Sequence, residues 1–210
     1  MTEELTDKPL RSDLKIISDL ISPGSRVLDI GCGDGTLLAH LAENKNIDAR
    51  GIELSQEGVN ACVAKGLSVI QGNADTDLAD YPSNAFDYVV LGQTLQATRS
   101  PKDVLTTLVR IGQHAIVSFV NVGHWRTRLS LILHGRVPVP DASHYSWYDS
   151  PDIHLCTVLD FVDLCEELGL KIDIGLSIDR NTKIQPIRTR SHTANLKGDQ
   201  AIFQLTRERS

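Results

Sequence analysis

Residues 27–35 have the sequence Val27-Leu28-Asp29-Ile30-Gly31-Cys32-Gly33-Asp34-Gly35, a short apolar run followed by three glycines at alternate positions. The apolar run predicts a buried strand. The glycines allow a sharp turn after that strand and leave no Cβ between the backbone and a ligand. Apolar residues at helical spacing follow from Leu37 onward. The segment therefore predicts a strand, a ligand-binding loop and a helix, in that order.

An acidic residue, Glu53, lies at the end of the next predicted strand, 49–54. A carboxylate in that place can accept both hydrogen bonds of a ribose diol, so the pattern indicates a nucleoside ligand. Dinucleotide-binding loops usually have the spacing GxGxxG, whereas this loop is GxGxG, and Asp29 would repel a pyrophosphate. Asp29 matches a ligand with an ammonium group, such as S-adenosylmethionine (SAM), whose sulfonium adds positive charge. We expect SAM rather than NAD; a tight turn without a ligand is the third interpretation.

The rest of the chain alternates predicted strands and helices, which is typical of an α/β domain with a mainly parallel sheet. The predicted strands are 26–30, 49–54, 67–71, 86–91, 115–120, 171–178 and 201–205. Ser55, Ser100-Pro101 and the pair Thr157 and Asp160 mark helix starts. The length predicts one domain over residues 1–210. The polar segment 179–199 predicts a long loop.

Composition and charge exclude several classes of function. The chain has 210 residues, of which 41% are hydrophobic, and a net charge of −6, whereas nucleic-acid binders usually carry a basic excess. No apolar run reaches the roughly 18 residues of a membrane helix, and the polar start 1–11 does not match a secretion signal. We therefore expect a cytoplasmic protein with no membrane or nucleic-acid partner. The four cysteines, Cys32, Cys62, Cys156 and Cys165, form no CxxC pair and predict free thiols.

Residues 121–156 interrupt the alternation and contain both tryptophans, two of the four tyrosines and four of the seven histidines. One interpretation is a lid over the sheet edge where the ligand lies. A second is a protein-binding surface, because Trp, Tyr and Arg are the usual interface anchors; its residues would be Trp125, Arg126, Arg128, Tyr145, Trp147 and Tyr148. A third is a methyl-acceptor pocket with a histidine base, for which the candidates are His124, His144 and His154, with Tyr145 in support. The spacing of these histidines does not match that of metal ligands on one helix, so we expect no metal.

The glycine loop together with Glu53 resembles the SAM-binding motif of class I methyltransferases. This resemblance implies a Rossmann-like fold: a mostly parallel seven-stranded sheet with helices on both faces and an antiparallel last strand. It also implies that Glu53 holds the ribose hydroxyls and that Asp29 helps to place the methionine end. Asn73 occupies the place of an aspartate that commonly contacts the adenine amino group; its side-chain oxygen can still accept a hydrogen bond. The expected cofactor-binding residues are Asp29, Gly31, Cys32, Gly33, Gly35, Glu53, Leu54, Asn73, Ala74 and Gln93.

Beyond this motif, the chain resembles the MetW methionine-biosynthesis family. The matching stretches are Ser25–Gly35, Gln93–Ala97, Phe119–Arg128, Gly135–Pro138, Tyr145–Cys156 with Asp160-Phe161, Asp179-Arg180 and, more weakly, Asn195-Leu196. The chain departs from the family pattern at Asn73, where aspartate is expected, and at 119–122, where Phe-Val-Asn-Val replaces Phe-Pro-Asn-Phe. The resemblance implies a partner, a homoserine O-acyltransferase that makes the activated homoserine ester for methionine synthesis.

Two functions from different classes follow. The first is an accessory protein that binds the acyltransferase through the aromatic segment and senses SAM or S-adenosylhomocysteine; a sensor needs the ligand site but no catalytic base. The second is a SAM-dependent methyltransferase that acts on a small molecule, with His124, His154 and Tyr145 as catalytic candidates. In that case Gln93 lines the pocket, because amides do no acid–base work near neutral pH.

Overall fold

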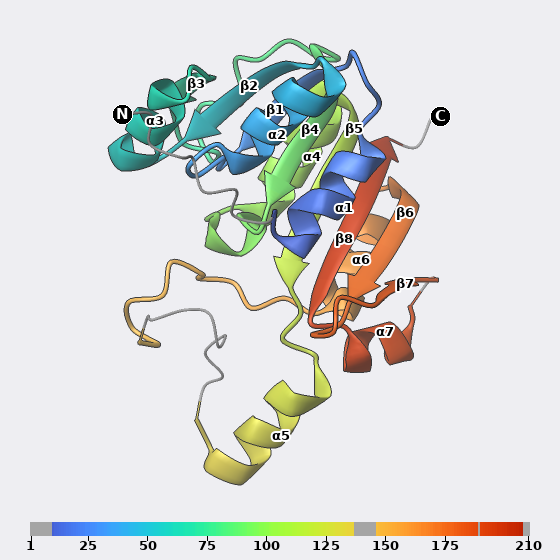
Figure 1. The fold of residues 1–210 in the computed structure, drawn as a ribbon. Helices are drawn as coiled ribbons and strands as arrows, with labels where there is room; N and C mark the ends of the chain where they lie inside the picture. Colours follow the sequence, from blue (N-terminus) through green and yellow to red (C-terminus); the bar gives the residue numbers. More distant parts are fainter. Residues whose placement is uncertain (1–9, 137–145, 189, 208–210) are drawn as a thin grey trace.

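The structure is a computed structural model that describes residues 10–136, 146–188 and 190–207 (Figure 1). Its centre is one eight-stranded sheet with the order β3-β2-β1-β4-β5-β8-β6-β7. The strands are β1 (Arg26–Ile30), β2 (Asp48–Glu53), β3 (Ser68–Gln71), β4 (Phe86–Gly92), β5 (Gly112–Val120), β6 (Leu170–Ile178), β7 (Ile184–Pro186) and β8 (Gln200–Arg207). From β3 to β5 all neighbours are parallel, β8 is antiparallel to both of its neighbours, and β7 is antiparallel to β6.

Helices cover both faces of the sheet (Figure 1). They are α1 (Ser12–Leu20), α2 (Thr36–Lys45), α3 (Gln56–Ala64), α4 (Pro101–Ile111), α5 (Trp125–His134), α6 (Val158–Glu167) and α7 (His192–Lys197), with a short 3-10 helix η1 (Leu95–Ala97). Apolar residues of α1 and α2 pack on one face and those of α4 and α6 on the other. Phe119, Phe161 and Phe203 pack together in the core between the sheet and the α4 and α6 face, with ring centroids 4.7–6.0 Å apart.

Three helices begin where the local sequence predicts, at Ser55, Ser100-Pro101 and Thr157. The Ser55 side chain accepts a hydrogen bond from the Gly58 backbone at the start of α3. Pro101 stands in the first turn of α4, where its missing N–H is not needed. Thr157 and Asp160 form a reciprocal capping box at the start of α6. These caps, the mainly parallel sheet and its antiparallel C-terminal strand confirm the predicted fold class.

Two features differ from the predictions. The sheet has eight strands rather than seven, and the segment 179–199 contains β7 and α7 instead of one long loop. β7 is a three-residue edge strand that pairs with β6 across a short turn, and α7 has only six residues. Such short polar elements have no apolar periodicity of their own, so their sequence resembles a loop.

Helix α5 is unlike the other helices. It follows β5 beyond the end of the sheet and extends away from the body of the molecule, as Figure 1 shows. None of its residues is buried. The helix ends at Gly135, which has the left-handed conformation typical of a C-terminal cap.

Candidate ligand-binding site

A cavity of about 420 Å³ lies at the carboxyl ends of the strands, within the size range of small-molecule sites. Its walls come from four regions: the end of β1, the end of β2, the segment after β3, and the turn after β4 with one residue of the 146–156 segment. The lining residues are Ile30, Gly31, Ile52, Glu53, Leu54, Gly72, Asn73, Ala74, Asp75, Thr94, Ala97, Thr98, Arg99 and Ile153. In open α/β sheets, ligands bind at this edge.

The glycine loop is shaped by conformations that L-residues rarely adopt. Gly31, Gly33 and Gly35 all have positive φ, at 72°, 57° and 76°. A Cβ on Gly31 would collide with the Thr94 side chain, and one on Gly35 would come within 2.8 Å of the Cys62 sulfur. A Cβ on Gly33 would meet nothing within 4 Å. Packing therefore requires glycine at 31 and 35, whereas Gly33 faces open space.

Glu53 is held in place by backbone donors on both sides. One carboxylate oxygen accepts a hydrogen bond from the Gly33 backbone N–H (2.9 Å), and the other accepts one from the Ser55 backbone N–H (2.8 Å). The carboxylate thus links the glycine loop to the end of β2. Each carboxylate oxygen has more than one lone pair, so Glu53 can accept further hydrogen bonds from a ligand in the cavity.

Asp29, the next-to-last residue of β1, is buried, and no side chain in the described part of the chain donates a hydrogen bond to its carboxylate. Burial raises the pKa of its carboxyl group to about 7, with a further increase from the charge of Glu53 and an opposing effect of Arg11. A buried carboxylate is unfavourable unless it is paired. Asp29 therefore fits a cationic ligand group, which would stabilise its ionised form.

The segment after β3 is held together by its own polar side chains. The Asn73 side-chain oxygen accepts a hydrogen bond from the Asp75 backbone N–H (2.9 Å). The Asp75 carboxylate in turn accepts from the backbone N–H groups of Arg99 and Ser100 at the start of α4. Both side chains line the cavity. Asn73 keeps its amide donors and a second lone pair for a ligand, while Asp75 is engaged at the start of α4.

Gln93 does not lie on the cavity wall. Its backbone has a positive φ of 55°, and its side-chain amide donates a hydrogen bond to Asp13 of α1 (2.9 Å). Asp13 also pairs with Arg11, with a shortest distance of 2.8 Å between charged atoms. Gln93 therefore holds the start of α1 in place through Asp13. Arg11, which pairs with Asp13, is close enough to the glycine loop to lower the pKa of Asp29.

The predicted cofactor-binding residues divide into two groups. Those on the cavity wall are Gly31, Glu53, Leu54, Asn73 and Ala74. The others, Asp29, Cys32, Gly33, Gly35 and Gln93, lie in or around the loop without lining the cavity. Cys32 is buried with its sulfur 3.9 Å from that of Cys62, so it packs beneath the loop.

Sequence reasoning missed several residues of the cavity wall. Thr94, Thr98 and Arg99 follow β4, and the position of that strand exit in the predicted sheet was a signal for them. Ile153 carried no such signal. It reaches the cavity because its backbone N–H, like that of His154, donates to the carbonyl of Gln96 in η1, at 2.9 and 3.0 Å.

The histidine candidates for catalysis do not line the cavity. His124 is buried, and its Nδ1 accepts the Arg126 backbone N–H (3.3 Å) as the N-cap of α5; its Nε2 is 3.8 Å from Asp199. Burial lowers the pKa of His124, with an opposing effect of Asp199. His154 contacts the Arg99 carbonyl at 3.3 Å, at the edge of the cavity. Tyr145 and His144 lie outside the described residues.

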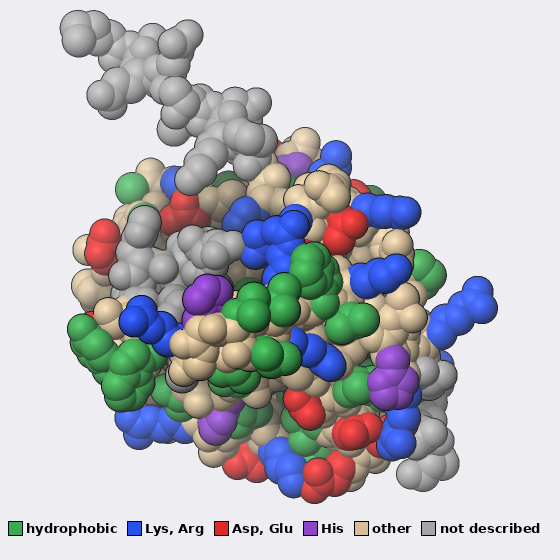
Figure 2. Space-filling view, turned by 90° about the horizontal axis from the view of Figure 1, so that it is seen from below, with side chains coloured by type: hydrophobic (Ala, Val, Ile, Leu, Met, Phe, Trp, Pro, Cys, Tyr) green, Lys and Arg blue, Asp and Glu red, His purple; other side chains and the backbone are tan. Residues whose placement is uncertain are grey.

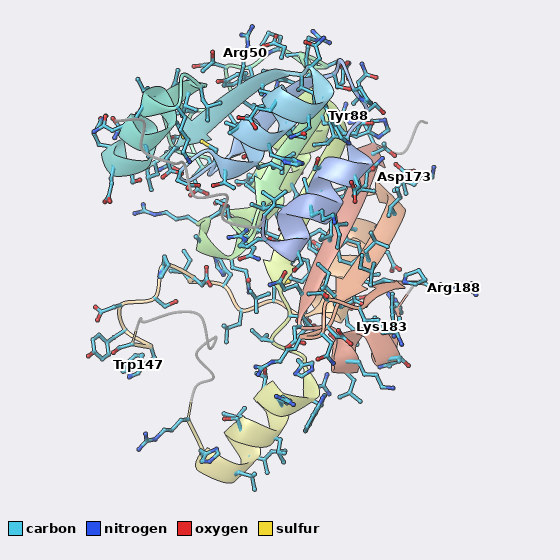
Figure 3. All side chains as sticks on the ribbon, in the orientation of Figure 1. Arg50, Tyr88, Trp147, Asp173, Lys183 and Arg188 are labelled. Atoms are coloured by element: carbon cyan, nitrogen blue, oxygen red, sulfur yellow. The ribbon has the colours of Figure 1, made fainter. Side chains whose placement is uncertain are left out.

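The residues predicted for partner binding are exposed. Trp147 lies on the 146–156 segment, away from the sheet (Figure 3), and its ring meets that of Tyr148 edge to face at 5.6 Å. On α5, the Arg126 guanidinium stacks over the Trp125 ring at 5.3 Å, and Arg128 donates to the Gly123 carbonyl at 2.6 Å. Tyr145, also predicted for this surface, lies outside the described residues.

No described helix is long and apolar enough to cross a membrane. Over residues 10–136, 146–188 and 190–207, no three His, Cys, Asp or Glu side chains gather in a way that could hold a metal ion.

The family model for methionine biosynthesis protein MetW matches residues 11–205. Among curated proteins, the chain is 32% identical to the bifunctional methionine biosynthesis protein MetXA/MetW of Rhodopirellula baltica over 214 residues. This match covers 97% of this chain but 34% of that relative, so the chain spans about a third of the length of the bifunctional protein.

Solved structures of methyltransferases share the fold. A SAM-dependent methyltransferase from Thermotoga maritima superposes with a TM-score of 0.68 at 17% identity, covering 94% of this chain and 88% of that one. A phosphoethanolamine N-methyltransferase of Haemonchus contortus, solved in complex with SAM, gives 0.67 at 14% identity, covering 94% and 52%. At these identities the likeness shows the fold alone.

Proposed function

Because the chain belongs to the MetW family of methionine biosynthesis proteins, we propose that it binds SAM in the cavity and serves as an accessory protein to a homoserine O-acyltransferase. The observation that carries the ligand is Asp29, a buried carboxyl group beside the glycine loop with a raised pKa and no side-chain hydrogen bond from the described residues. Such a group favours a ligand that is both nucleoside-like and cationic, and SAM is both.

Each part of SAM has a matching group around the cavity. Glu53 accepts hydrogen bonds from the ribose hydroxyls, Asp29 stabilises the positively charged methionine end, and Asn73 contacts the adenine. S-adenosylhomocysteine shares the ribose and the adenine but has no sulfonium charge. It therefore lacks the attraction between that charge and the Asp29 carboxylate, and we expect it to bind more weakly. When bound, SAM supplies an electrophilic methyl group.

The cavity favours a binding role over methyl transfer. The two carboxylates on its described wall, Glu53 and Asp75, both accept hydrogen bonds from backbone N–H groups, which engage them in holding the loops. A general base must lie within hydrogen-bond reach of the proton that it removes. A protein that senses SAM needs no such base, which supports the accessory role.

The partner is supported by two observations. The relative from Rhodopirellula baltica is named for MetXA and MetW functions in one polypeptide, and linking two modules in one chain raises their effective concentration. In this chain, Trp125, Trp147 and Tyr148 expose large aromatic surface to solvent. Aromatic side chains of this kind dominate the energetics of protein interfaces.

The test is the acyl-transfer rate of a homoserine O-acyltransferase from the same source, measured with and without this protein at two SAM concentrations. We expect a rate that depends on this protein and changes with SAM. A dependence on the protein alone supports the accessory role without SAM sensing. An unchanged rate together with no co-purification contradicts the accessory role.

The alternative is a SAM-dependent methyltransferase that acts on a small molecule. It is favoured by one contact, that of His154 with the Arg99 carbonyl at the cavity edge. If methyl transfer occurs, the His154→Ala variant loses the transfer rate but keeps its SAM affinity. His124→Ala is the comparison, because His124 caps α5 and its loss acts through folding. Equal loss of SAM affinity and rate in both variants assigns both histidines to structure.

A further inference from the structure

Helix α5 carries an apolar stripe that nothing in the described chain covers. Trp125, Leu129, Ile132 and Leu133 are 44%, 43%, 78% and 66% exposed. Their spacing of i, i+4, i+7 and i+8 places them on one side of the helix, in a stripe about 100° wide. In a water-soluble helix this stripe normally faces a core, yet α5 has no buried residue. We call these four residues the α5 stripe.

Positive charge borders the α5 stripe on both edges. By helical spacing, Arg126 lies along one edge and Arg128 along the other. The helix contains no acidic residue, although the whole chain has a net charge of −6. Seen from below, the face that includes the α5 end shows hydrophobic side chains gathered next to blue Lys and Arg side chains (Figure 2). The stripe is therefore apolar in its middle and basic at its edges.

The base of α5 is fixed to the body by a buried polar node. Asn121 donates from its side chain to the carbonyls of Asn195 and Gly198, at 2.8 and 2.7 Å. Its side-chain oxygen accepts from the backbone N–H groups of Gly123 and Val158, at 3.0 and 3.2 Å. Buried polar groups that are fully hydrogen-bonded hold one geometry. The node presents the stripe in a defined direction at the end of the sheet.

We propose that the α5 stripe inserts into an apolar groove of the homoserine O-acyltransferase whose two rims carry carboxylates. This inference rests on the proposed function and names the element and the chemistry of its docking. An amphipathic helix that lies in a groove with anchors at i, i+4 and i+7 is a recurring mode of recognition. The arginine on each edge requires an acid on each rim, and such rim charges set the orientation and the association rate.

Charge favours the acyltransferase over the other occupants of this surface. A second copy of the chain packed with its α5 parallel would bring Arg126 and Arg128 against the same arginines, which is unfavourable. An anionic membrane would attract these arginines but repel a chain of net charge −6. The bifunctional relative holds its two named functions in one polypeptide, so the acyltransferase is the protein at the required proximity.

The experiment measures binding of this chain to the acyltransferase from the same source by isothermal titration, with variants of the stripe. We expect Ile132→Asp with Leu133→Asp to weaken binding by about 30-fold or more, the scale of interface hot spots. Val63→Asp is the matched control: Val63 is 58% exposed on α3, so this variant keeps the wild-type affinity. Arg126→Glu should lower the association rate and its dependence on salt. Circular dichroism confirms that each variant is folded.

The outcomes separate the two claims. If the wild-type chain binds the acyltransferase and the stripe variants bind it equally well, the α5 stripe is not the docking element. The proposed function then still holds. No binding by the wild-type chain overturns the proposed function and the stripe together. Sedimentation that shows a wild-type dimer and a monomeric Ile132→Asp variant assigns the stripe to a second copy. Flotation with vesicles of phosphatidylserine and phosphatidylcholine, lost in Ile132→Asp, assigns it to a lipid surface; either result overturns the proposal.

Discussion

The cavity and helix α5 lie at the same end of the sheet but are built in opposite ways. Around the cavity, the polar side chains are held by other groups of the chain: Glu53 by two backbone N–H groups and Asp75 by the start of α4. On α5, large apolar side chains face solvent and contribute nothing to the core. The first construction fits a small molecule that is recognised by hydrogen bonds. The second fits a surface that is completed only by another macromolecule.

Each region is built to bind its own ligand when the other ligand is absent, so under that condition a change in one should leave the other intact. Variants of the cavity should affect SAM affinity but not docking, and variants of α5 should do the reverse. The predictions below test this separation, beginning with the largest expected effect.

The largest effect is expected at Gly31. A Gly31→Val side chain collides with Thr94 and must also adopt a positive φ, so we expect a loss of roughly 2–5 kcal/mol in the free energy of unfolding and no SAM binding. Chemical denaturation and calorimetric titration measure the two effects. The companion is Gly33→Val, whose Cβ meets no protein atom: it should destabilise less while still blocking the ligand. A stable Gly31→Val that binds SAM normally contradicts the placement of the loop.

Glu53→Ala should weaken SAM binding by about 1–3 kcal/mol, because the charge-assisted hydrogen bonds to the ribose are lost. Glu53→Gln serves as the control, since the amide keeps one acceptor oxygen and should lose less. Affinity for the acyltransferase, measured without SAM, should stay at the wild-type value in both variants. A loss of docking in Glu53→Ala would show that the two regions are not separate.

The pH dependence of SAM affinity should report Asp29. With its pKa raised to about 7, the free protein carries a proton on Asp29 below that pH, and a cationic ligand must displace it. Affinity should therefore fall about tenfold between pH 8 and pH 6. Asp29→Asn should bind SAM weakly and without this pH dependence. A flat profile in the wild-type protein contradicts the role given to Asp29.

The same raised pKa has a consequence for folding. The folded protein holds the Asp29 proton more tightly than the unfolded chain, whose aspartate has its ordinary pKa of 3.8. The contribution of this group to stability is therefore present below pH 4 and is lost as the pH rises toward 7. Asp29→Asn should be more stable than the wild-type protein above pH 7, which thermal denaturation at two pH values measures.

The smallest effect on stability is expected at Trp147. Its ring is exposed and contacts only Tyr148 among the described aromatic residues, so Trp147→Ala should change the free energy of unfolding by less than about 0.5 kcal/mol. Affinity for the acyltransferase should nevertheless decrease, as titration would show. A variant that is destabilised but docks normally would make Trp147 a packing residue.

The difference between the two regions also explains what could be predicted. Strands, helix caps and the glycine loop depend on residues close in sequence. For example, Ser55 caps α3, which follows it directly, and Glu53 is the last residue of β2. Contacts between distant residues were not accessible in this way. Gln93 was predicted to face the ligand, but it bonds to Asp13 in α1, and Ile153 reaches the cavity through a backbone hydrogen bond that any residue could make.

The exposure of α5 also has a consequence for local unfolding. Because no residue of α5 is buried, the helix can unfold while the sheet and its flanking helices stay intact. Its amide protons should exchange with solvent through this local opening rather than through global unfolding. The local unfolding should stop at the base of the helix, because the Asn121 side chain makes buried hydrogen bonds to the carbonyls of Asn195 and Gly198. We therefore expect α5 to open as a cooperative unit separate from the sheet and its flanking helices, and a bound partner to slow that opening.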